Sequence, residues 1–229
     1  MIYHYDLHIH SVLSPCSDLL MTPNNILNMA MLKGLDIISI TDHNSLKQLP
    51  VIYELSKSYD FLLIPGVEVT LKTGEHLLIY FKTIEEAMRF DQVLDQFRPL
   101  VRNSHGLASI TDMEDFVIES FPYISSEPLM IDYQMLMKVL KPYEYRIVLA
   151  HIDRPSSNII ERLDQYQMNG IELTSCDELI VSQYGLSRYF IFYNSDAHDL
   201  LQISEAKKHN TIDLESLSID AFFRYFQNE

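Results

Sequence analysis

Histidine and carboxylate side chains recur along this chain beside short apolar segments that have the composition of β-strands. They form the clusters Asp6-Leu-His8-Ile-His10, Thr41-Asp42-His43, Glu68, His76, His151 and Asp196-Ala-His198. Imidazole nitrogens and carboxylate oxygens are protein ligands of Zn²⁺, Mn²⁺ and Fe²⁺. Every cluster closes an apolar segment except His76, which begins one. The residue types therefore indicate a metal site, provided that the fold brings the clusters together.

The apolar segments themselves predict the architecture. The candidate strands are Tyr3–Ile9, Asp36–Ile40, Phe61–Val67, His76–Phe81, Arg146–Ala150, Gly170–Thr174 and Tyr189–Asn194. Near-continuous apolar character is typical of parallel strands that are covered on both faces. Helix-like stretches separate these strands, after Thr22-Pro23, Ser45 and Thr83 and at Tyr133–Leu140, Ser156–Met168, Asp177–Leu186 and Glu215–Phe226. The alternation predicts an α/β fold whose parallel sheet is either open or closed as a barrel.

In parallel α/β folds the carboxyl ends of the strands form one functional rim. Each cluster alone has a plainer interpretation: His8 and His10 share one face of a strand by chance, or Glu68 is a solvated carboxylate. Their joint position at strand ends is harder to explain in that way. We therefore expect the clusters to meet at the rim as a metal centre.

Composition limits the classes of partner. The chain has 229 residues and a formal net charge of −15. This length fits one domain, residues 1–229, and the charge disfavours duplex nucleic acid and anionic membranes. No apolar run reaches the ~20 residues of a membrane span. The start has no signal-peptide pattern, and Cys16 and Cys176 give no disulfide framework, so we expect a cytoplasmic protein.

One stretch interrupts the alternation. Residues 99–131 contain proline, serine, asparagine and acidic residues without clear periodicity. A loop of this length inside a compact domain is usually a lid or an insertion. Its aromatic residues Phe116, Phe121 and Tyr123 either stack on a base or pack as a small core, and packing is the favoured alternative.

Several motifs together carry a family resemblance. In order they are DLHIHS, ITDHNS, PGVEVT, GEHLLIYF, LAHIDRP and NSDAH. They resemble the PHP (polymerase and histidinol phosphatase) superfamily, and among its members the stand-alone bacterial PHP-domain metal-dependent phosphoesterases. The resemblance covers about residues 1–98 and 144–200. It implies a distorted seven-stranded (β/α) TIM-like barrel that holds two or three divalent ions, namely Zn, Mn or Fe.

The resemblance also implies the ligands of these ions. The matching positions in this sequence are His8, His10, Cys16, His43, Glu68, His76, His151, Asp196 and His198. Cys16 departs from the pattern, because many relatives have His or Asp there. Asp18 is a substitute donor for that position, and Asp42 is expected to orient a liganding imidazole.

Such a centre predicts a hydrolase of phosphate esters, in which a di- or trinuclear site activates hydroxide. We expect Glu68, Asp196 and Arg154 to have catalytic roles, although Arg154 can equally form a surface salt bridge. The ions would attract a small phosphorylated substrate: a phosphomonoester, a nucleotide or a short oligonucleotide end. Two alternatives stay open, a non-catalytic or regulatory metal-binding PHP module and a polymerase-accessory PHP protein that acts in trans.

Overall fold

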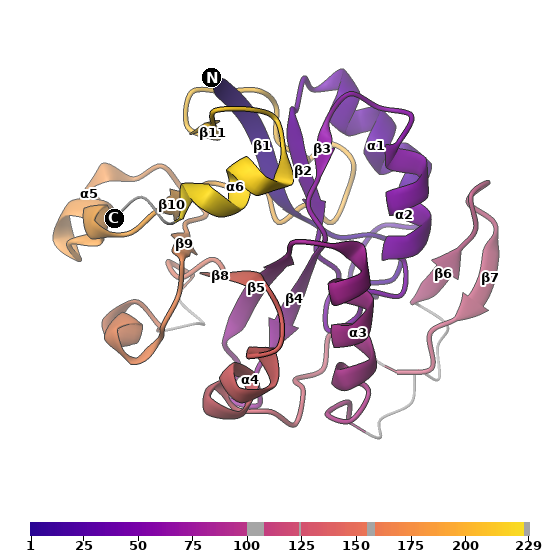
Figure 1. Ribbon diagram of the computed structural model, residues 1–229, viewed down its shortest axis with the longest axis horizontal. Helices are drawn as coiled ribbons and strands as arrows, with labels where there is room; N and C mark the ends of the chain where they lie inside the picture. The colour runs from indigo at the N-terminus through magenta and orange to yellow at the C-terminus, as the bar shows by residue number, and fades with distance from the viewer. Residues whose placement is uncertain (100–107, 124, 155–158, 227–229) are drawn as a thin grey trace.

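Two mixed β-sheets form the centre of the protein (Figure 1). The structure is a computed structural model that describes residues 1–99, 108–123, 125–154 and 159–226. One sheet has the order β11 (Thr211–Asp213), β1 (Ile2–Ile9), β2 (Ile37–Ile40), β3 (Leu62–Leu63). The other has the order β10 (Ile191–Phe192), β9 (Gly170–Glu172), β8 (Tyr145–Leu149), β5 (His76–Phe81), β4 (Gly66–Thr70). A separate hairpin consists of β6 (Ser109–Thr111) and β7 (Val117–Ser120).

The α/β class is confirmed, but a closed barrel of parallel strands is wrong for the described residues. Strands β1, β2 and β3 are parallel, as are β8, β9 and β10. Strand β5, in contrast, runs antiparallel to both β4 and β8. The reason is the short connection 71–75 between β4 and β5, which turns through Gly74 at a φ of 92°. A connection this short can only join antiparallel neighbours, because a parallel pair needs a crossover.

The predicted strands coincide with most strands of the two sheets, but they miss one break and three short strands. The expected strand Phe61–Val67 is divided into β3 and the start of β4, with Pro65 in the break, because proline lacks the N–H that a central strand donates. Strands β6, β7 and β11 had no counterpart in the sequence reading.

Six α-helices and two 3₁₀ helices occur in the described residues. They are α1 (Pro23–Leu32), α2 (Leu49–Ser56), α3 (Ile84–Leu94), α4 (Tyr133–Leu140), η1 (Ile160–Gln165), α5 (Glu178–Gln183), η2 (Leu186–Arg188) and α6 (Ile219–Tyr225). The helix expected after Thr83 is confirmed as α3, and the Thr83 hydroxyl caps it by accepting the Glu86 N–H. The helix expected at Ser156–Met168 is only η1, and residues 156–158 lie outside the described part. No helix in the described ranges combines the length and the apolar character that a membrane span requires.

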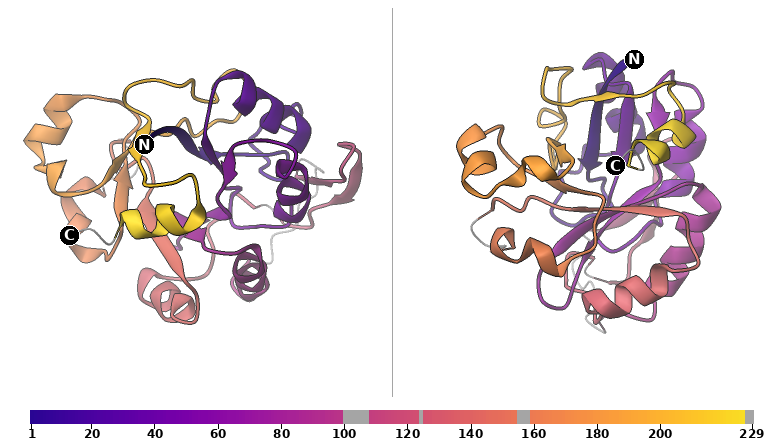
Figure 2. Two further views of the ribbon diagram at one scale, coloured as in Figure 1. Left: turned by 45° about the horizontal axis from the view of Figure 1, so that its top comes forward. Right: turned by 60° about the vertical axis from the view of Figure 1, so that its left-hand side comes forward.

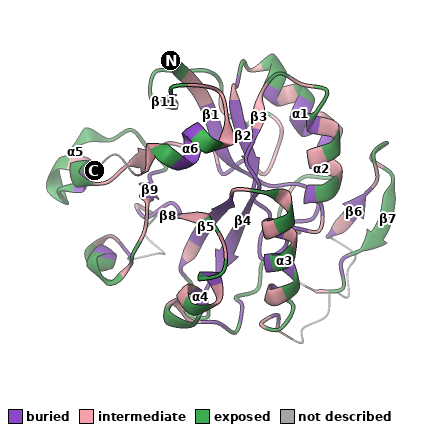
Figure 3. Cartoon of the chain, viewed as in Figure 1, coloured by how far each residue is buried: buried purple, intermediate pink, exposed green. Residues whose placement is uncertain are grey.

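Two apolar clusters hold these elements together (Figure 3). The larger one packs helices α1 to α4 against the sheets. The smaller one draws Tyr5 and Leu7 from β1, Tyr80 from β5, and Phe222 and Phe223 from α6. Helix α6 thus covers the space between the two sheets (Figures 1 and 2). Burial of this apolar surface fixes the relative positions of the strand ends.

The β6–β7 hairpin projects from the rest of the molecule (Figure 1, and Figure 2, left). Phe121 and Tyr123 pack with Leu13, Ala108 and Ile110, which confirms the packing alternative for these two aromatic residues. Phe116, in contrast, is exposed. Residues 100–107 and 124 of the expected lid, including His105, lie outside the described residues.

The described part of this insertion is attached to two loops and to strand β4, each of which carries a predicted ligand. The Ser109 N–H donates to the Val12 carbonyl at 3.0 Å, and the Leu129 N–H donates to the Thr70 carbonyl at 2.9 Å. The Asn44 amide donates to the Ser125 carbonyl at 2.7 Å. Val12, Asn44 and Thr70 follow His10, His43 and Glu68 within two residues. The segment therefore supports the backbone beside each of these three side chains.

Candidate metal centre

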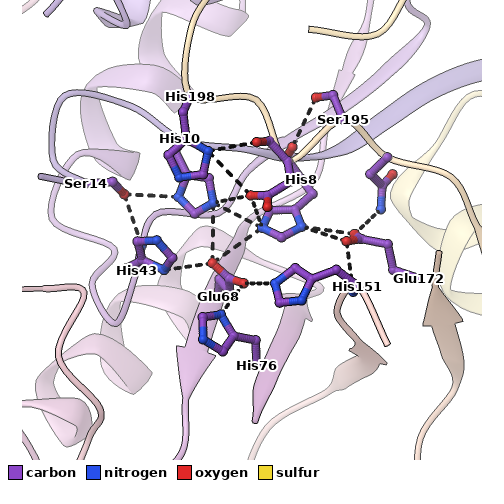
Figure 4. Close-up of polar contacts among 12 residues, drawn as sticks. His8, His10, Ser14, His43, Glu68, His76, His151, Glu172, Ser195 and His198 are labelled. Atoms are coloured by element: carbon purple, nitrogen blue, oxygen red, sulfur yellow. Dashed lines mark hydrogen bonds and ion pairs between the residues drawn. The ribbon is translucent and has the colours of Figure 1, made fainter. Parts of the chain in front are cut away.

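Eight of the nine predicted ligands approach one another at the rim (Figure 4). Most follow or end strands, as expected. His76 begins β5, yet it reaches the same rim because β5 is antiparallel to its neighbours. Its register pairs His76 with Thr70 at the end of β4, and Leu77 with Leu149 at the end of β8. The antiparallel strand, which contradicts the parallel barrel, is therefore what brings His76 into the centre.

The first group of donors is fully enclosed. It consists of His8, His10, Glu68 and Asp196, whose ligand atoms lie within 4.8 Å of one another. The Nε2 atoms of His8 and His10 are 3.1 Å apart. Asp196 Oδ1 lies 3.2 Å from the first and 3.0 Å from the second. Two imidazoles and two carboxylates that point at one volume match the donor set of a divalent ion.

Two further groups share members with this one. His10, His43 and His198 form one, and His43, Glu68 and His76 form the other. His10 therefore links the enclosed group to the first of these, and Glu68 links it to the second. Glu68 Oε1 lies 2.7 Å from His76 Nδ1 and 3.1 Å from His151 Nε2, while Oε2 lies 2.7 Å from His43 Nδ1. Both carboxylate oxygens therefore face imidazoles on different sides, which is the arrangement of a bridging ligand.

Unpartnered atoms provide a test of whether this site fits a metal. His43 Nδ1 and Glu68 Oε2 are buried and make no hydrogen bond, although they lie 2.7 Å apart. Buried polar atoms without a hydrogen-bond partner are rare, because desolvation is costly. His151 Nδ1 is a further buried atom of this kind. A cation between the donors would coordinate His43 Nδ1 and Glu68 Oε2, which make no hydrogen bond in the protein, so the residues fit divalent ions.

Glu172, at the end of β9, orients His8 and was missed in the sequence. Its carboxylate oxygens lie 3.0 and 3.1 Å from His8 Nδ1, and the side chain is buried. It also accepts the His151 N–H at 3.1 Å and the Asn194 amide at 2.8 Å. With Nδ1 donating to Glu172, the Nε2 lone pair of His8 points into the cluster. The available signal was an acidic residue that ends an apolar strand.

A chain of hydrogen bonds through Ser14 to Asp42 orients His10. The Ser14 hydroxyl lies 3.1 Å from His10 Nδ1 and donates to Asp42 at 2.7 Å. Asp42 also accepts the backbone N–H and the hydroxyl of Ser11. The predicted orienting role of Asp42 therefore operates through Ser14, which was not identified in the sequence.

The backbone is held in unusual conformations at the rim. Positive φ angles occur at Asn44 (53°), His151 (33°) and Asp196 (50°). Left-handed conformations cost free energy in residues with a Cβ and cluster at functional sites. Here they turn the chain where it leaves a strand, so that the His151 and Asp196 side chains face the cluster.

Burial and charge shift the pKa values of the histidines in opposite directions. Burial alone lowers the pKa of His8 and of His43. The carboxylates Glu172, Asp196 and Glu68 nevertheless raise the pKa of His8 well above its usual value. Chiefly through Glu68, the pKa of His43 rises to about 10. Burial and the neighbouring charge of His43 lower the pKa of His10 to about 3, so His10 stays neutral.

The pKa values of the carboxylates Glu68 and Asp196 are lowered. Burial would raise the pKa of Glu68, but the charges of His43 and His8 bring it well below its usual value. The same balance, dominated by His8 and His10, lowers the pKa of Asp196. Without a metal the cluster is therefore a set of carboxylate–imidazolium pairs, whose protons a metal ion must displace.

Cys16, the ninth predicted ligand, lies beside this centre. Burial would raise the pKa of its thiol, but hydrogen bonds with His198 and His43 lower it to about 7. Cys16 and the alternative donor Asp18 are both exposed residues, and Asp18 accepts the Leu20 N–H at 2.8 Å.

Arg154 and Asp153 follow His151. Arg154 Nη2 lies 2.5 Å from Asp196 Oδ2, so this guanidinium is at the edge of the cluster. Asp153 accepts the N–H and the hydroxyl of Thr174, so its carboxylate is engaged outside the cluster.

Comparison with known proteins identifies the class. The fold is α/β, and its rim carries buried His, Glu and Asp clusters suited to metal binding. The sequence matches the PHP domain family over residues 6–208, and the chain belongs to this family. It is 32% identical over 112 residues to an uncharacterised protein of Methanocaldococcus jannaschii, a match that covers 45% of this chain and 63% of that protein.

Solved structures share the fold. The lesion-specific endonuclease PfuEndoQ of Pyrococcus furiosus has a TM-score of 0.71 at 18% identity, over 98% of this chain and 55% of that chain. A two-domain protein of Bacteroides vulgatus that contains a predicted PHP-like metal-dependent phosphoesterase has a TM-score of 0.54 at 18% identity, over 100% of this chain and 63% of that chain. The chain thus spans less than two thirds of the length of these relatives.

Proposed function

We propose that this protein is a metal-dependent phosphoesterase that hydrolyses small phosphate esters. The observation that carries the proposal is the convergence of buried imidazoles on two carboxylates, with donor atoms that have no hydrogen-bond partner. Relatives of the same fold are named as a phosphoesterase and an endonuclease, and both names denote hydrolysis of phosphate esters.

The proposed ligands of two or three divalent ions, with zinc, manganese or iron as candidates, are His8, His10, Cys16, His43, Glu68, His76, His151, Asp196 and His198. Glu68 is the proposed bridge, because its Oε2 faces His8 and His10 of one group while its Oε1 faces His76 of another. Cys16 is the proposed fourth donor beside His10, His43 and His198, since its thiol hydrogen-bonds to two of them.

The protein's own residues supply position and charge. When bound, the ions would activate a water molecule and neutralise charge on the phosphoryl oxygens. Glu172 and Ser14 hold the His8 and His10 rings in place, so the donors need little rearrangement. Arg154, at the edge of the cluster, offers a guanidinium fork for two non-bridging phosphate oxygens.

The substrate is proposed to be small. A chain with a net charge of −15 repels long polyanions, whereas the ions attract a phosphate group locally. We therefore propose phosphomonoesters, nucleotides and short oligonucleotide ends as the preferred substrates. Duplex DNA is a less favoured substrate for this chain.

Hydrolysis by the metal-reconstituted protein tests the proposal. The protein is stripped with chelator, reloaded separately with Mn²⁺, Zn²⁺ or Fe²⁺, and assayed with p-nitrophenyl phosphate and a panel of phosphorylated metabolites. A duplex with an abasic site is the comparison substrate, and Glu68→Gln is the inactive control. Metal-dependent release of phosphate supports the proposal. Loaded protein that hydrolyses nothing in the panel would indicate a binding module or an accessory protein that acts in trans.

A further inference from the structure

A cavity of about 280 Å³ adjoins the metal centre. His76 and His151, the two imidazoles that contact Glu68 Oε1, form its inner wall together with Arg154. Glu75 forms part of the same lining, and Ala150 and Ile159 add apolar surface. A group bound at the ions would therefore have this cavity beside it.

Glu75 is a carboxylate that is almost completely buried although it lines this cavity. Its side chain is buried, with 4% of the residue exposed. It accepts hydrogen bonds from the hydroxyl groups of Thr73 and Tyr166, the latter at 3.0 Å, and Arg162 Nη2 lies 3.5 Å away. A carboxylate has about four acceptor sites, so the two hydroxyl groups and Arg162 together leave capacity for a further donor.

We propose that this cavity holds the leaving alcohol of the ester, and that Glu75 accepts a hydrogen bond from a hydroxyl group on it. The inference rests on the phosphoesterase function proposed above. It adds the class of substrate, namely the phosphate ester of a hydroxyl-rich alcohol such as a sugar or polyol, in preference to an aryl ester.

The chemistry of the wall selects a hydroxyl group. The lining offers an acceptor in Glu75 and a donor in Arg154, and a hydroxyl group can donate to one and accept from the other. An ammonium group would match Glu75 but would meet the positive charge of Arg154. An aryl group could form neither of these two hydrogen bonds, and its apolar surface would lie against two charged side chains.

The size of the cavity limits the alcohol. Ligand clefts usually have volumes of about 300–1,000 Å³, so this one is at the small end of the range. It suits one sugar-sized unit and disfavours a chain of nucleotides. The sugar would lie against Ala150 and Ile159 while its hydroxyl groups face Glu75 and Arg154.

The test compares the selectivity of wild-type protein and of Glu75→Gln, both loaded with Mn²⁺. The kcat/KM for ribose 5-phosphate is divided by that for phenyl phosphate. Because one hydrogen bond to a charged group is lost, we expect this ratio to fall about tenfold or more in Glu75→Gln. Glu161→Gln, the same substitution at an exposed position of η1, should leave the ratio at the wild-type value.

A ratio that stays the same in Glu75→Gln would overturn the proposal, because Glu75 would then not distinguish the alcohols. If thermal melting shows that this variant is unfolded, Tyr166→Phe replaces it, since it removes one partner that orients the Glu75 carboxylate. We expect Tyr166→Phe to raise KM for ribose 5-phosphate alone, and equal KM changes for both esters would reject the cavity. Wild-type protein that hydrolyses other phosphate esters of the panel but not ribose 5-phosphate would likewise overturn the cavity assignment, whereas protein that hydrolyses nothing in the panel would reject the phosphoesterase function itself.

Discussion

The carboxylate of Glu172 lies 3.0 Å from Nδ1 of His8, and both side chains are buried. This contact fixes the ring of His8 and directs its other nitrogen at the donors of Asp196 and Glu68. The negative charge of Glu172 also strengthens the imidazole as a ligand. Glu172 therefore belongs to the site although it is not one of its proposed ligands.

Replacing Glu172 should weaken metal binding without removing a ligand. We expect Glu172→Gln to lower metal affinity by about 10–100-fold, the usual effect of losing a partner that orients a liganding imidazole. Competition with a chromophoric chelator measures the dissociation constant. Asp153→Asn is the matched control, because Asp153 is a nearby carboxylate that bonds to Thr174 instead of to an imidazole. Equal affinities of Glu172→Gln and wild type would remove Glu172 from the site.

The proposed bridge can be tested by an isosteric change. Glu68→Gln keeps the size of a fully buried side chain but removes the charge that faces His43, His76 and His151. We expect hydrolysis to fall below detection and metal content to drop by about one ion or more per chain. His198→Ala, at a partly exposed residue, should lose activity while its melting temperature stays near that of the wild type. Near-wild-type turnover in either variant would contradict the ligand assignment.

Local sequence signals account for much of the fold and for the donors at the rim. The apolar segments around His8, His43 and His151 mark strands or their ends, and each strand end has a side chain of the right chemistry. These features are local, because strand periodicity and ligand chemistry are read from neighbouring residues.

The long-range relationships could not be predicted in this way. Glu172 is separated from His8 by 164 residues, and only tertiary packing brings them together. Nor did the sequence reading recognise the turn at Gly74, so β5 was expected to be parallel. The same oversight left His76 as the one donor that did not fit the pattern of strand ends, although the antiparallel direction explains its place.

Arg154 should act on the substrate more than on the metal. Its guanidinium contacts Asp196 and lines the cavity beside the centre. We expect Arg154→Ala to raise KM for a phosphate ester about tenfold and to change metal content little. Steady-state kinetics and elemental analysis provide the two readouts. Arg188→Ala, which breaks an exposed pair with Asp164, is the control for loss of a charge. If Arg154→Ala has wild-type kinetics, the contact with Asp196 is only a salt bridge.

Metal affinity should increase with pH. The pKa of His43 is raised to about 10 in the metal-free protein, and that of His8 is raised well above its usual value. Both imidazoles therefore carry a proton at neutral pH, and a metal ion can bind only when these protons leave. We expect binding to release protons and the affinity to rise from pH 6 to pH 9. Calorimetry in buffers with different ionisation enthalpies counts the protons, and pH-independent affinity would contradict the metal-free charge states.

Cys16 provides the most specific test of the ligand set. Its thiol lies against His43 and His198, and their hydrogen bonds lower its pKa to about 7, so a large fraction is thiolate at neutral pH. A thiolate binds zinc strongly and favours softer ions over Mg²⁺. We expect alkylation of Cys16 to be fast in metal-free protein and slow in metal-loaded protein, with Cys176 as the internal control because burial raises the pKa of that thiol. Mass spectrometry of timed iodoacetamide reactions measures both sites in one sample.

Cys16→Ala should lose about one metal per chain, whereas Cys16→Asp should keep activity with a preference for harder ions such as Mn²⁺. If Cys16→Ala retains full metal content and turnover, Cys16 is not a ligand, and Asp18 becomes the donor to test by the same substitution.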